Sequence, residues 1–179
     1  VKFGGTVRFD IVDGKLKAFH ENYEPVWAIP YDIPIIGYGC NTVNTLRLWS
    51  AEPFENVFDF ASFSRGDYIK AVEYRYMVQS ITQVLYPDDT NEQNRILRLK
   101  QEYFFVSAGV QSIIRRFKKR GKPIYELPNY VMIQINDTHP ALVIPELMRI
   151  LIDEEGLGWE EAWEITTNTV AYTNHTIMA

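Results

Sequence analysis

The feature that most constrains this fold is a long amphipathic segment near the middle of the chain. Apolar residues recur there at spacings of three and four, which places them along one face of a helix of about six turns. The helix is expected to end near Gly121, because glycine favours the position after a helix and Pro123 lies just beyond it. The predicted apolar face consists of Ile96, Leu99, Tyr103, Val106, Val110, Ile113 and Phe117.

The first 38 residues show the period-two alternation of strands instead. Asp13 and Gly14 are typical of a tight hairpin turn, since both tolerate a positive φ. Residues 42–49 form another candidate strand, and residues 53–64 are expected to be irregular or weakly helical. Three prolines should allow only short or edge strands in this region: Pro25, Pro30 and Pro34.

Helices are predicted on both sides of the central segment. Asp67 is a suitable N-cap for one or two helices through residues 68–85, and the polar residues 87–91 should then form a loop. Near the C-terminus, a helix is expected over residues 142–152. Pro145 either stands in its first turn or kinks it.

Composition narrows the class of protein. With 179 residues, 46% of them hydrophobic, the chain suits one globular domain, and its net charge of −5 argues against a nucleic-acid partner. A single cysteine, Cys40, fits a reducing compartment, and no apolar run is long enough to span a bilayer. We therefore expect a cytoplasmic protein without a membrane partner. Neither end resembles a signal peptide or a solvating tail, so both are expected to be interior points of a longer protein.

Two short apolar segments, residues 131–135 and 170–173, are predicted to be buried strands, and each ends in polar residues. Asp137 and His139 follow the first strand, and Asn174 and His175 follow the second. If the strands are parallel neighbours, one carboxylate and two imidazoles line a single crevice, where open α/β sheets bind ligands.

The same residues could instead serve only the fold. Thr138 or His139 would then cap the following helix, and Asp137 would tether the loop. A metal site is a third interpretation, because Asp137, His139 and His175 are ligand types for zinc or iron, although Asp-x-His is a common pattern. Spacing alone leaves the pocket and the capping interpretation equally open.

Two charged clusters were also considered. Asp88 and Asp89 could act as an acid and a base, but paired aspartates on a turn are more often turn formers. Six basic residues occupy the eight positions from Arg115 to Lys122 and could bind a phosphate. Because they lie at the C-terminal end of the long helix, where cations complement the helix dipole, the simpler explanation is favoured.

Four longer strings are more specific than these patterns: residues 41–51 (NTVNTLRLWSA), 97–104 (LRLKQEYF), 136–149 (NDTHPALVIPELMR) and 171–176 (AYTNHT). In this order and spacing the chain closely resembles the α-glucan phosphorylases, which act on glycogen, starch or maltodextrin. The resemblance implies an α/β fold, the later part of a Rossmann-like N-terminal domain of glycosyltransferase-B type. That domain would have an antiparallel β region at its start and long helices. Residues 1–179 would be a single incomplete domain, without the C-terminal pyridoxal-phosphate domain.

The resemblance also implies a reaction. Members of the family cleave a terminal α-1,4-linked glucosyl unit with inorganic phosphate and release glucose 1-phosphate with retained configuration. They use pyridoxal 5′-phosphate, whose phosphate relays a proton to the attacking phosphate, in a site between two Rossmann-like domains. The lysine that holds this cofactor belongs to the C-terminal domain. The chain is therefore expected to have no cofactor-binding residue and no activity by itself.

Individual roles follow from the same resemblance. His175 would contact the glucosyl ring as the catalytic residue, and Asp137 and His139 would line the adjoining pocket. Asp89 and Thr90 would lie on a mobile gate loop, with Thr90 standing where animal enzymes carry an asparagine.

Two further resemblances concern regulation and assembly. Arg115 and Arg116 match the arginine pair that grips the phosphate of AMP in the muscle-type allosteric enzyme, which makes them candidates for phosphate or effector binding. Residues 67–85 resemble the tower helix through which family members form homodimers.

Two other functions compete with an enzyme fragment. A binding module would hold glucan at Asp137 and His139 without chemistry, and weak oligosaccharide affinity of the chain alone would favour it. A metal-dependent hydrolase would use Asp137, His139 and His175 as ligands, and stoichiometric zinc would favour that.

Overall fold

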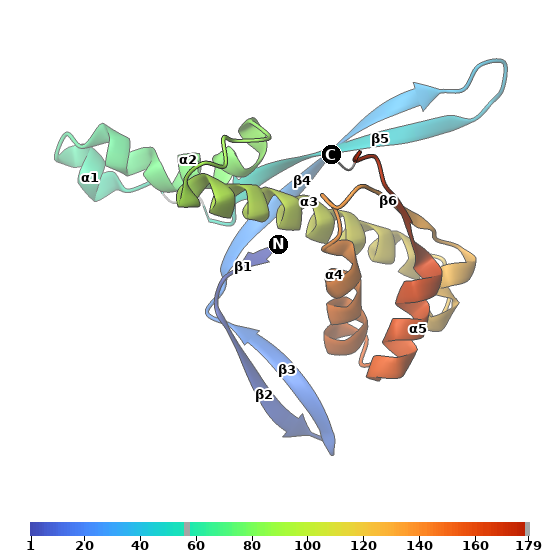
Figure 1. Cartoon of the computed structure of the whole chain (residues 1–179). Coiled ribbons are helices and arrows are strands. Elements are labelled where there is room, and N and C mark those ends of the chain that lie inside the picture. Colours follow the sequence, from blue (N-terminus) through green and yellow to red (C-terminus); the bar gives the residue numbers. More distant parts are fainter. Residues whose placement is uncertain (56–57, 178–179) are drawn as a thin grey trace. The chain divides into compact units, whose positions relative to one another are not determined.

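A computed structural model describes residues 1–55 and 58–177 and shows a mixed α/β chain (Figure 1). The chain divides into two compact units, which are described separately. Unit 1 comprises residues 1–4 and 23–104, and unit 2 comprises residues 5–22 and the described part of 105–179. The single incomplete domain expected from the sequence stays a prediction.

Unit 1 contains a three-stranded antiparallel sheet in the order β1-β4-β5. Strands β4 and β5 form a long hairpin, paired from Val26 opposite Pro53 to Ile36 opposite Val43. Two helices and the first part of a third complete the unit. The elements are β1 (Lys2–Phe3), β4 (Glu24–Ile36), β5 (Val43–Pro53), α1 (Phe60–Ser64), α2 (Tyr68–Gln83) and α3 (Glu92–Lys118), the last of which continues into unit 2.

Strand β4 is an edge strand for most of its length, as predicted, but it is not short. The N–H of Val26 bonds toward β1, and the N–H of Gly37 donates to Thr42 O on the β5 side. Because alternate residues of a strand turn their N–H groups to opposite edges, Pro30 and Pro34 share the parity of Val26 and face away from β5. Their missing N–H groups remove no bond from the β4–β5 ladder, so a 13-residue strand can contain them.

The start signal predicted for α2 is confirmed, and α3 has a start signal that was not predicted. The carboxylate of Asp67 accepts from the N–H of Lys70 and caps α2. The side chain of Asn91 accepts from the N–H of Asn94 at 2.8 Å at the start of α3. The region predicted to be weakly helical contains the short helix α1; its residues 56–57 lie outside the described residues.

Unit 2 combines a hairpin with helices packed around a two-stranded parallel sheet. The hairpin turn is the one predicted, with a φ of 54° at Asp13 and 74° at Gly14. The elements are β2 (Thr6–Val12), β3 (Lys15–Glu21), the C-terminal part of α3, the 3-10 helix η1 (Ile124–Asn129), β6 (Ile133–Asn136), α4 (Val143–Arg149), the π-helical turn η2 (Ile150–Glu154), α5 (Trp159–Thr169) and β7 (Val170–Thr173).

One hydrophobic core joins α3, α4, α5, η1 and β6 in unit 2, with Phe117, Leu127 and Leu147 among its fully buried side chains. Pro145 is the third residue of α4, so it stands in the first turn. Strand β6 was predicted to be buried, but its side chains alternate between inside and outside, with Ile135 buried and Gln134 exposed. The sheet therefore turns only one face to the core.

The apolar face predicted for α3 is correct in its second half and wrong at its start. Val106, Val110 and Phe117 are buried, whereas Ile96 and Leu99 are 50% and 57% exposed. The apolar repeat includes the N-terminal end of α3, where the other described parts of unit 1 leave these two side chains about half exposed. The spacing of apolar residues therefore predicted the helix correctly but overestimated the length of its buried face.

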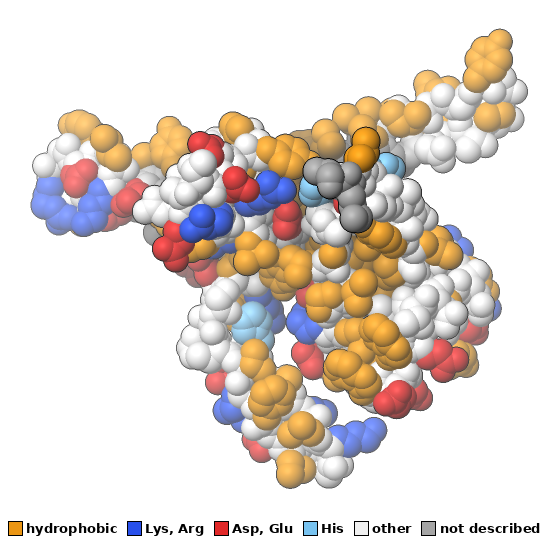
Figure 2. Space-filling model, viewed as in Figure 1, with side chains coloured by type: hydrophobic (Ala, Val, Ile, Leu, Met, Phe, Trp, Pro, Cys, Tyr) orange, Lys and Arg blue, Asp and Glu red, His pale blue; other side chains and the backbone are white. Residues whose placement is uncertain are grey.

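Both hairpins keep apolar side chains at the surface (Figure 2). On β2 and β3, the exposed fractions of Val7, Phe9, Ile11 and Leu16 lie between 56% and 72%. The β2–β3 hairpin thus contributes little to the core of its unit, whereas the β4–β5 hairpin contributes the buried Val26 and Ala51. In the part of the chain that the structure describes, no helix combines the length and apolar character needed to cross a membrane.

Candidate functional site

The two predicted strand ends meet in unit 2. Strands β6 and β7 are parallel neighbours, with Asn136 opposite Thr173 at the last paired position. The residues that follow both strands therefore leave the sheet at the same edge, where open α/β folds place ligand sites. The parallel pairing on which the predicted shared crevice depends is therefore present.

Asp137 joins the two chain segments at this edge. Its φ of 61° lies in the left-handed region, which non-glycine residues seldom adopt and which occurs often at functional sites. One carboxylate oxygen accepts from the N–H of Thr138 at 3.0 Å, and the other accepts from the hydroxyl of Thr176 at 2.6 Å. Its own N–H donates to Thr173 O at 2.7 Å. The loop after β6 is thereby fixed to the segment after β7.

These contacts lower the pKa of Asp137 below its ordinary value. The hydrogen bond from Thr176 is the largest cause, and burial acts in the opposite direction. The N–H of Thr138 and the charges of His139 and His175 lower the pKa further. The contacts thus favour the charged form of Asp137 and hold its acceptor oxygens in a defined place.

His139 and His175 are both exposed, and both interact electrostatically with Asp137. The carboxylate and the two imidazoles thus belong to one cluster that a polar ligand can reach. Among residues 1–55 and 58–177, no three His, Cys, Asp or Glu side chains are grouped so that they could hold a metal ion. The cluster offers hydrogen-bond donors and acceptors.

The alternative in which Thr138 or His139 caps the next helix is wrong. Helix α4 has Leu142 at its N-cap, and no side chain bonds to the helix start there. A backbone turn leads into the helix instead, with Ala141 N–H donating to Thr138 O at 3.0 Å. The second part of that alternative, a loop tethered by Asp137, is confirmed. A structural tether and a ligand-binding carboxylate are compatible roles.

Asp89 and Thr90 belong to unit 1, on the exposed loop between α2 and α3. The carboxylate of Asp88 accepts from the N–H of Thr90 at 3.1 Å, which confirms that Asp88 forms the turn. The carboxylate of Asp89 lies 3.7 Å from a guanidinium nitrogen of Arg98. A gating role for Asp89 and Thr90 stays a prediction.

Arg115 and Arg116 are exposed in the last turns of α3, where their charge complements the helix dipole. Arg115 lines a surface pocket of about 500 Å³ in unit 2, together with Lys118 and Glu155. Lys118 is paired with Glu155 at 2.8 Å, so the positive charge at this pocket is partly neutralised. Binding of a phosphate or an effector at Arg115 and Arg116 stays a prediction.

Sequence reasoning missed Thr176 as a site residue. Its hydroxyl makes the shortest described contact of Asp137, across 39 positions of the chain. A usable signal was present, because Thr176 directly follows His175 beyond the second strand end. Its contact with Asp137 depends on the parallel pairing of β6 and β7, which was an assumption at the level of sequence.

The fold and the candidate site define an α/β protein with polar groups where two parallel strands end. A family model described as carbohydrate phosphorylase matches residues 1–179, and the chain belongs to this family. The resemblance to α-glucan phosphorylases is thereby confirmed.

Similar proteins come from bacteria, plants and animals. The chain is 49% identical over 179 residues to a glycogen phosphorylase of Bacillus subtilis (strain 168), covering 100% of this chain and 21% of that protein. It is 50% identical over 160 residues to the α-glucan phosphorylase H isozyme of Solanum tuberosum, covering 87% and 19%. It is 55% identical over 161 residues to the brain form of human glycogen phosphorylase, covering 86% and 19%. The chain thus spans about a fifth of the length of these relatives.

Proposed function

We propose that this chain is part of an α-glucan phosphorylase, which transfers the terminal α-1,4-linked glucosyl unit of a glucan to inorganic phosphate and yields glucose 1-phosphate. The observation that carries the proposal is the cluster of ionised Asp137 with His139 and His175, in a chain that matches the family from end to end. Glucan and phosphate would be its partners, as the names of the relatives suggest.

The chemistry of a sugar explains why such a cluster is useful. A glucosyl unit presents hydroxyl groups, so its site needs fixed donors and acceptors, and the loss of one partner in a closed site costs about 1–3 kcal/mol. Asp137 supplies acceptor oxygens whose direction is set by Thr138 and Thr176. His175 would contact the glucosyl ring, with His139 beside it. A carboxylate near the ring also stabilises the positive charge that develops on the sugar in the transition state.

Pyridoxal 5′-phosphate would supply the proton-transfer chemistry when bound. The strand-end cluster contains carboxylate, imidazole and hydroxyl groups but no lysine amine that could bind the aldehyde of this cofactor. Its residues therefore do not fit as the attachment site, and we place that lysine in a C-terminal domain outside this chain. The residues of this chain bind and orient the sugar.

The proposal also covers the fold of the parent domain, the assembly of the full-length protein and its location in the cell. Strands β6 and β7 would belong to a Rossmann-like sheet of glycosyltransferase-B type whose other strands lie outside the chain, so that residues 1–179 form part of one domain. The segment 67–85 would form a homodimer interface. Apolar side chains of α2 that are 61% to 83% exposed are available for it: Tyr68, Ile69, Tyr76 and Met77. The single, exposed Cys40 is consistent with a reducing cytoplasm.

The proposal is tested by phosphorolysis of maltoheptaose with the full-length protein that contains this chain, recording pyridoxal absorbance in parallel. We expect activity with bound cofactor, and a loss of about 5-fold to 150-fold in kcat/KM for His175→Ala, equivalent to about 1–3 kcal/mol. His20→Ala is the matched control, since His20 lies on hairpin strand β3. An inactive protein without cofactor would refute the proposal and favour a glucan-binding module, and stoichiometric zinc would favour a hydrolase.

A further inference from the structure

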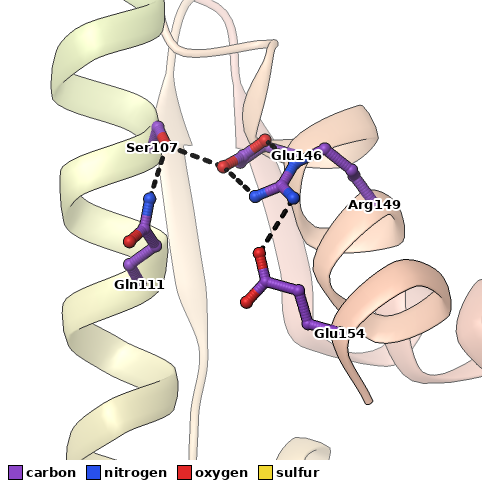
Figure 3. A network of polar contacts seen from close by, with 5 residues as sticks. All are labelled: Ser107, Gln111, Glu146, Arg149 and Glu154. Carbon is purple, nitrogen blue, oxygen red and sulfur yellow. Dashed lines mark hydrogen bonds and ion pairs between the residues drawn. The ribbon is translucent and has the colours of Figure 1, made fainter. Parts of the chain in front are cut away.

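A polar network built around a buried carboxylate lies in unit 2 and shares no residue with the strand-end site (Figure 3). The carboxylate of Glu146, in α4, accepts a hydrogen bond from the hydroxyl of Ser107, in α3, at 2.7 Å. Arg149 binds the same carboxylate with two nitrogens, at 2.8 and 3.0 Å, and also donates to Glu154 at 2.9 Å. Gln111 donates to the hydroxyl of Ser107 at 2.9 Å. The network ties α4 to α3 through one carboxylate.

The burial of this carboxylate calls for a reason. Glu146 is 3% exposed and Ser107 is 1% exposed, in a region otherwise packed with apolar side chains. A buried ion pair seldom adds net stability, because the cost of removing its charges from water is close to the gain from pairing them. It does define geometry, since a two-pronged arginine–carboxylate pair and a short hydroxyl bond tolerate little displacement. The network is better suited to fixing the place of α4 than to strengthening the core.

The position of Glu146 in the chain connects it to the site. It is the fourth residue of α4, and it follows His139 by seven positions. Overlapping backbone turns cover the whole stretch between the site loop and Glu146, so a shift of α4 is transmitted to that loop. These turns join Ala141 N to Thr138 O at 3.0 Å, Val143 N to Pro140 O at 2.9 Å and Glu146 N to Leu142 O at 3.0 Å.

We propose that Glu146, held by Ser107 and Arg149, is a positioning residue that sets the place of the loop carrying Asp137 and His139. It does not touch the sugar and acts through the turns that begin at Thr138. Loss of the network would let α4 move and would misdirect the carboxylate of Asp137. This role rests on the proposed function, because it assigns the loop to a glucosyl site.

The experiment compares three variants of the full-length protein. Glu146→Gln removes the charge and the two-pronged pairing, and Ser107→Ala removes only the link to α3. Glu154→Gln is the matched control. The side chain of Glu154 is 51% exposed, and its substitution removes the second, outer carboxylate partner of Arg149 while leaving the contacts of Glu146 intact. If Glu146→Gln does not fold, Ser107→Ala still tests the link, since it keeps the ion pair.

Two measurements distinguish positioning from stability. We expect faster amide hydrogen exchange over residues 137–143 in Glu146→Gln and Ser107→Ala, with the β2–β3 hairpin unchanged. We also expect a fall of at least about tenfold in kcat/KM for maltoheptaose in Glu146→Gln, at a temperature where the variant is fully folded, because small misplacements of binding groups are costly. The control should match the wild type in both measurements.

The role would be overturned if Glu146→Gln and Ser107→Ala lowered only the unfolding temperature, with wild-type exchange at residues 137–143 and wild-type kcat/KM per folded molecule. Failure of the proposed function looks different. It would appear as an inactive wild-type protein, and the exchange measurement would then still decide whether Glu146 positions the loop.

Discussion

Asp137 holds the fold together and is also the acceptor that the proposed function requires. Its left-handed backbone directs the chain out of β6, and its carboxylate receives donors from the loops after both strands. The same contacts that hold the loop also lower the pKa of the carboxylate, with the hydrogen bond from Thr176 as the largest cause. An acceptor prepared in this way needs little rearrangement when a hydroxyl ligand arrives.

The hydroxyl of Thr176 should control the ionisation of Asp137. Thr176→Val removes the largest cause of the lowered pKa, so we expect the pKa to rise toward the ordinary 3.8, while Thr176→Ser keeps it low. Because the folded pKa lies below the unfolded one, the charged carboxylate stabilises the fold above pH 3.8, and this contribution is lost as the pH falls through the folded pKa. In the valine variant the contribution should be smaller and its loss should be complete at a higher pH, because only the folded pKa has risen.

Carbon-13 NMR of the Asp137 carboxyl group measures this shift directly. Identical titration curves for wild type and Thr176→Val would show that the hydroxyl does not bind the carboxylate in solution. His175→Ala is expected to move the pKa in the same direction but by less, because the charge of His175 is the smallest cause of the lowering.

At this scale the sequence identified the groups but not their partners. That Asp137, His139 and His175 follow two strand ends could be predicted, and the parallel pairing of the strands brings them to one edge of the sheet. The partner of Asp137 could not be predicted, because the contact with Thr176 exists only in the register that places Asn136 opposite Thr173. A contact between distant residues depends on how strands pair, and residue spacing does not determine that.

Among the elements, the β4–β5 hairpin gives a test of strand parity. Ile33 has the opposite parity to Pro30 and Pro34, so its N–H faces β5, where it lies opposite Leu46. Ile33→Pro should remove a ladder hydrogen bond, costing about 0.5–1.5 kcal/mol before any steric effect. Ile36 has the same parity as Pro30 and Pro34, so its N–H faces away from β5, and Ile36→Pro should leave the ladder hydrogen bonds intact. Hydrogen exchange of β5 amides would show the difference, and equal protection in both variants would contradict the parity assignment.

Helix α3 shows what apolar periodicity can and cannot predict. It gave the helix, yet Ile96 and Leu99 are exposed while Gln101 and Ser107 are buried. Each buried polar side chain is satisfied by another segment: Gln101 donates to Val84 O at 2.8 Å, and Ser107 donates to Glu146. Periodicity ranks residues by hydrophobicity alone, so it misses a polar group whose burial depends on a partner elsewhere.

Glu146 was missed for the same reason. It stands with Arg149, three positions later, in a helix whose other inward residues are apolar, such as Val143 and Leu147. An acidic and a basic residue at this spacing on the inner face of a helix are a usable signal of a buried ion pair. The apolar repeat of this segment predicts the helix but carries no information on the charged pair.

For the whole molecule, two parallel strands are too few to define a Rossmann-like sheet. The family was recognisable because long strings of residues identify it, and the match over residues 1–179 confirms it. The architecture of the parent domain was not derivable, because most of its sheet would come from segments outside a chain that spans about a fifth of its relatives. A chain can therefore be assigned to its family from sequence even when it contains only part of the domain to which it belongs.

The last prediction concerns the chain as a whole: the isolated 179-residue chain should form no glucose 1-phosphate from maltoheptaose and phosphate. Under the proposed function its cluster would supply contacts to the sugar, whereas the lysine and the phosphate-binding groups are expected in another domain. The assay is a coupled measurement of glucose 1-phosphate, with the full-length protein as the positive control under the same conditions. Product formed by the pure chain would show that its own residues suffice for the reaction, and the division of labour between domains would then have to be abandoned.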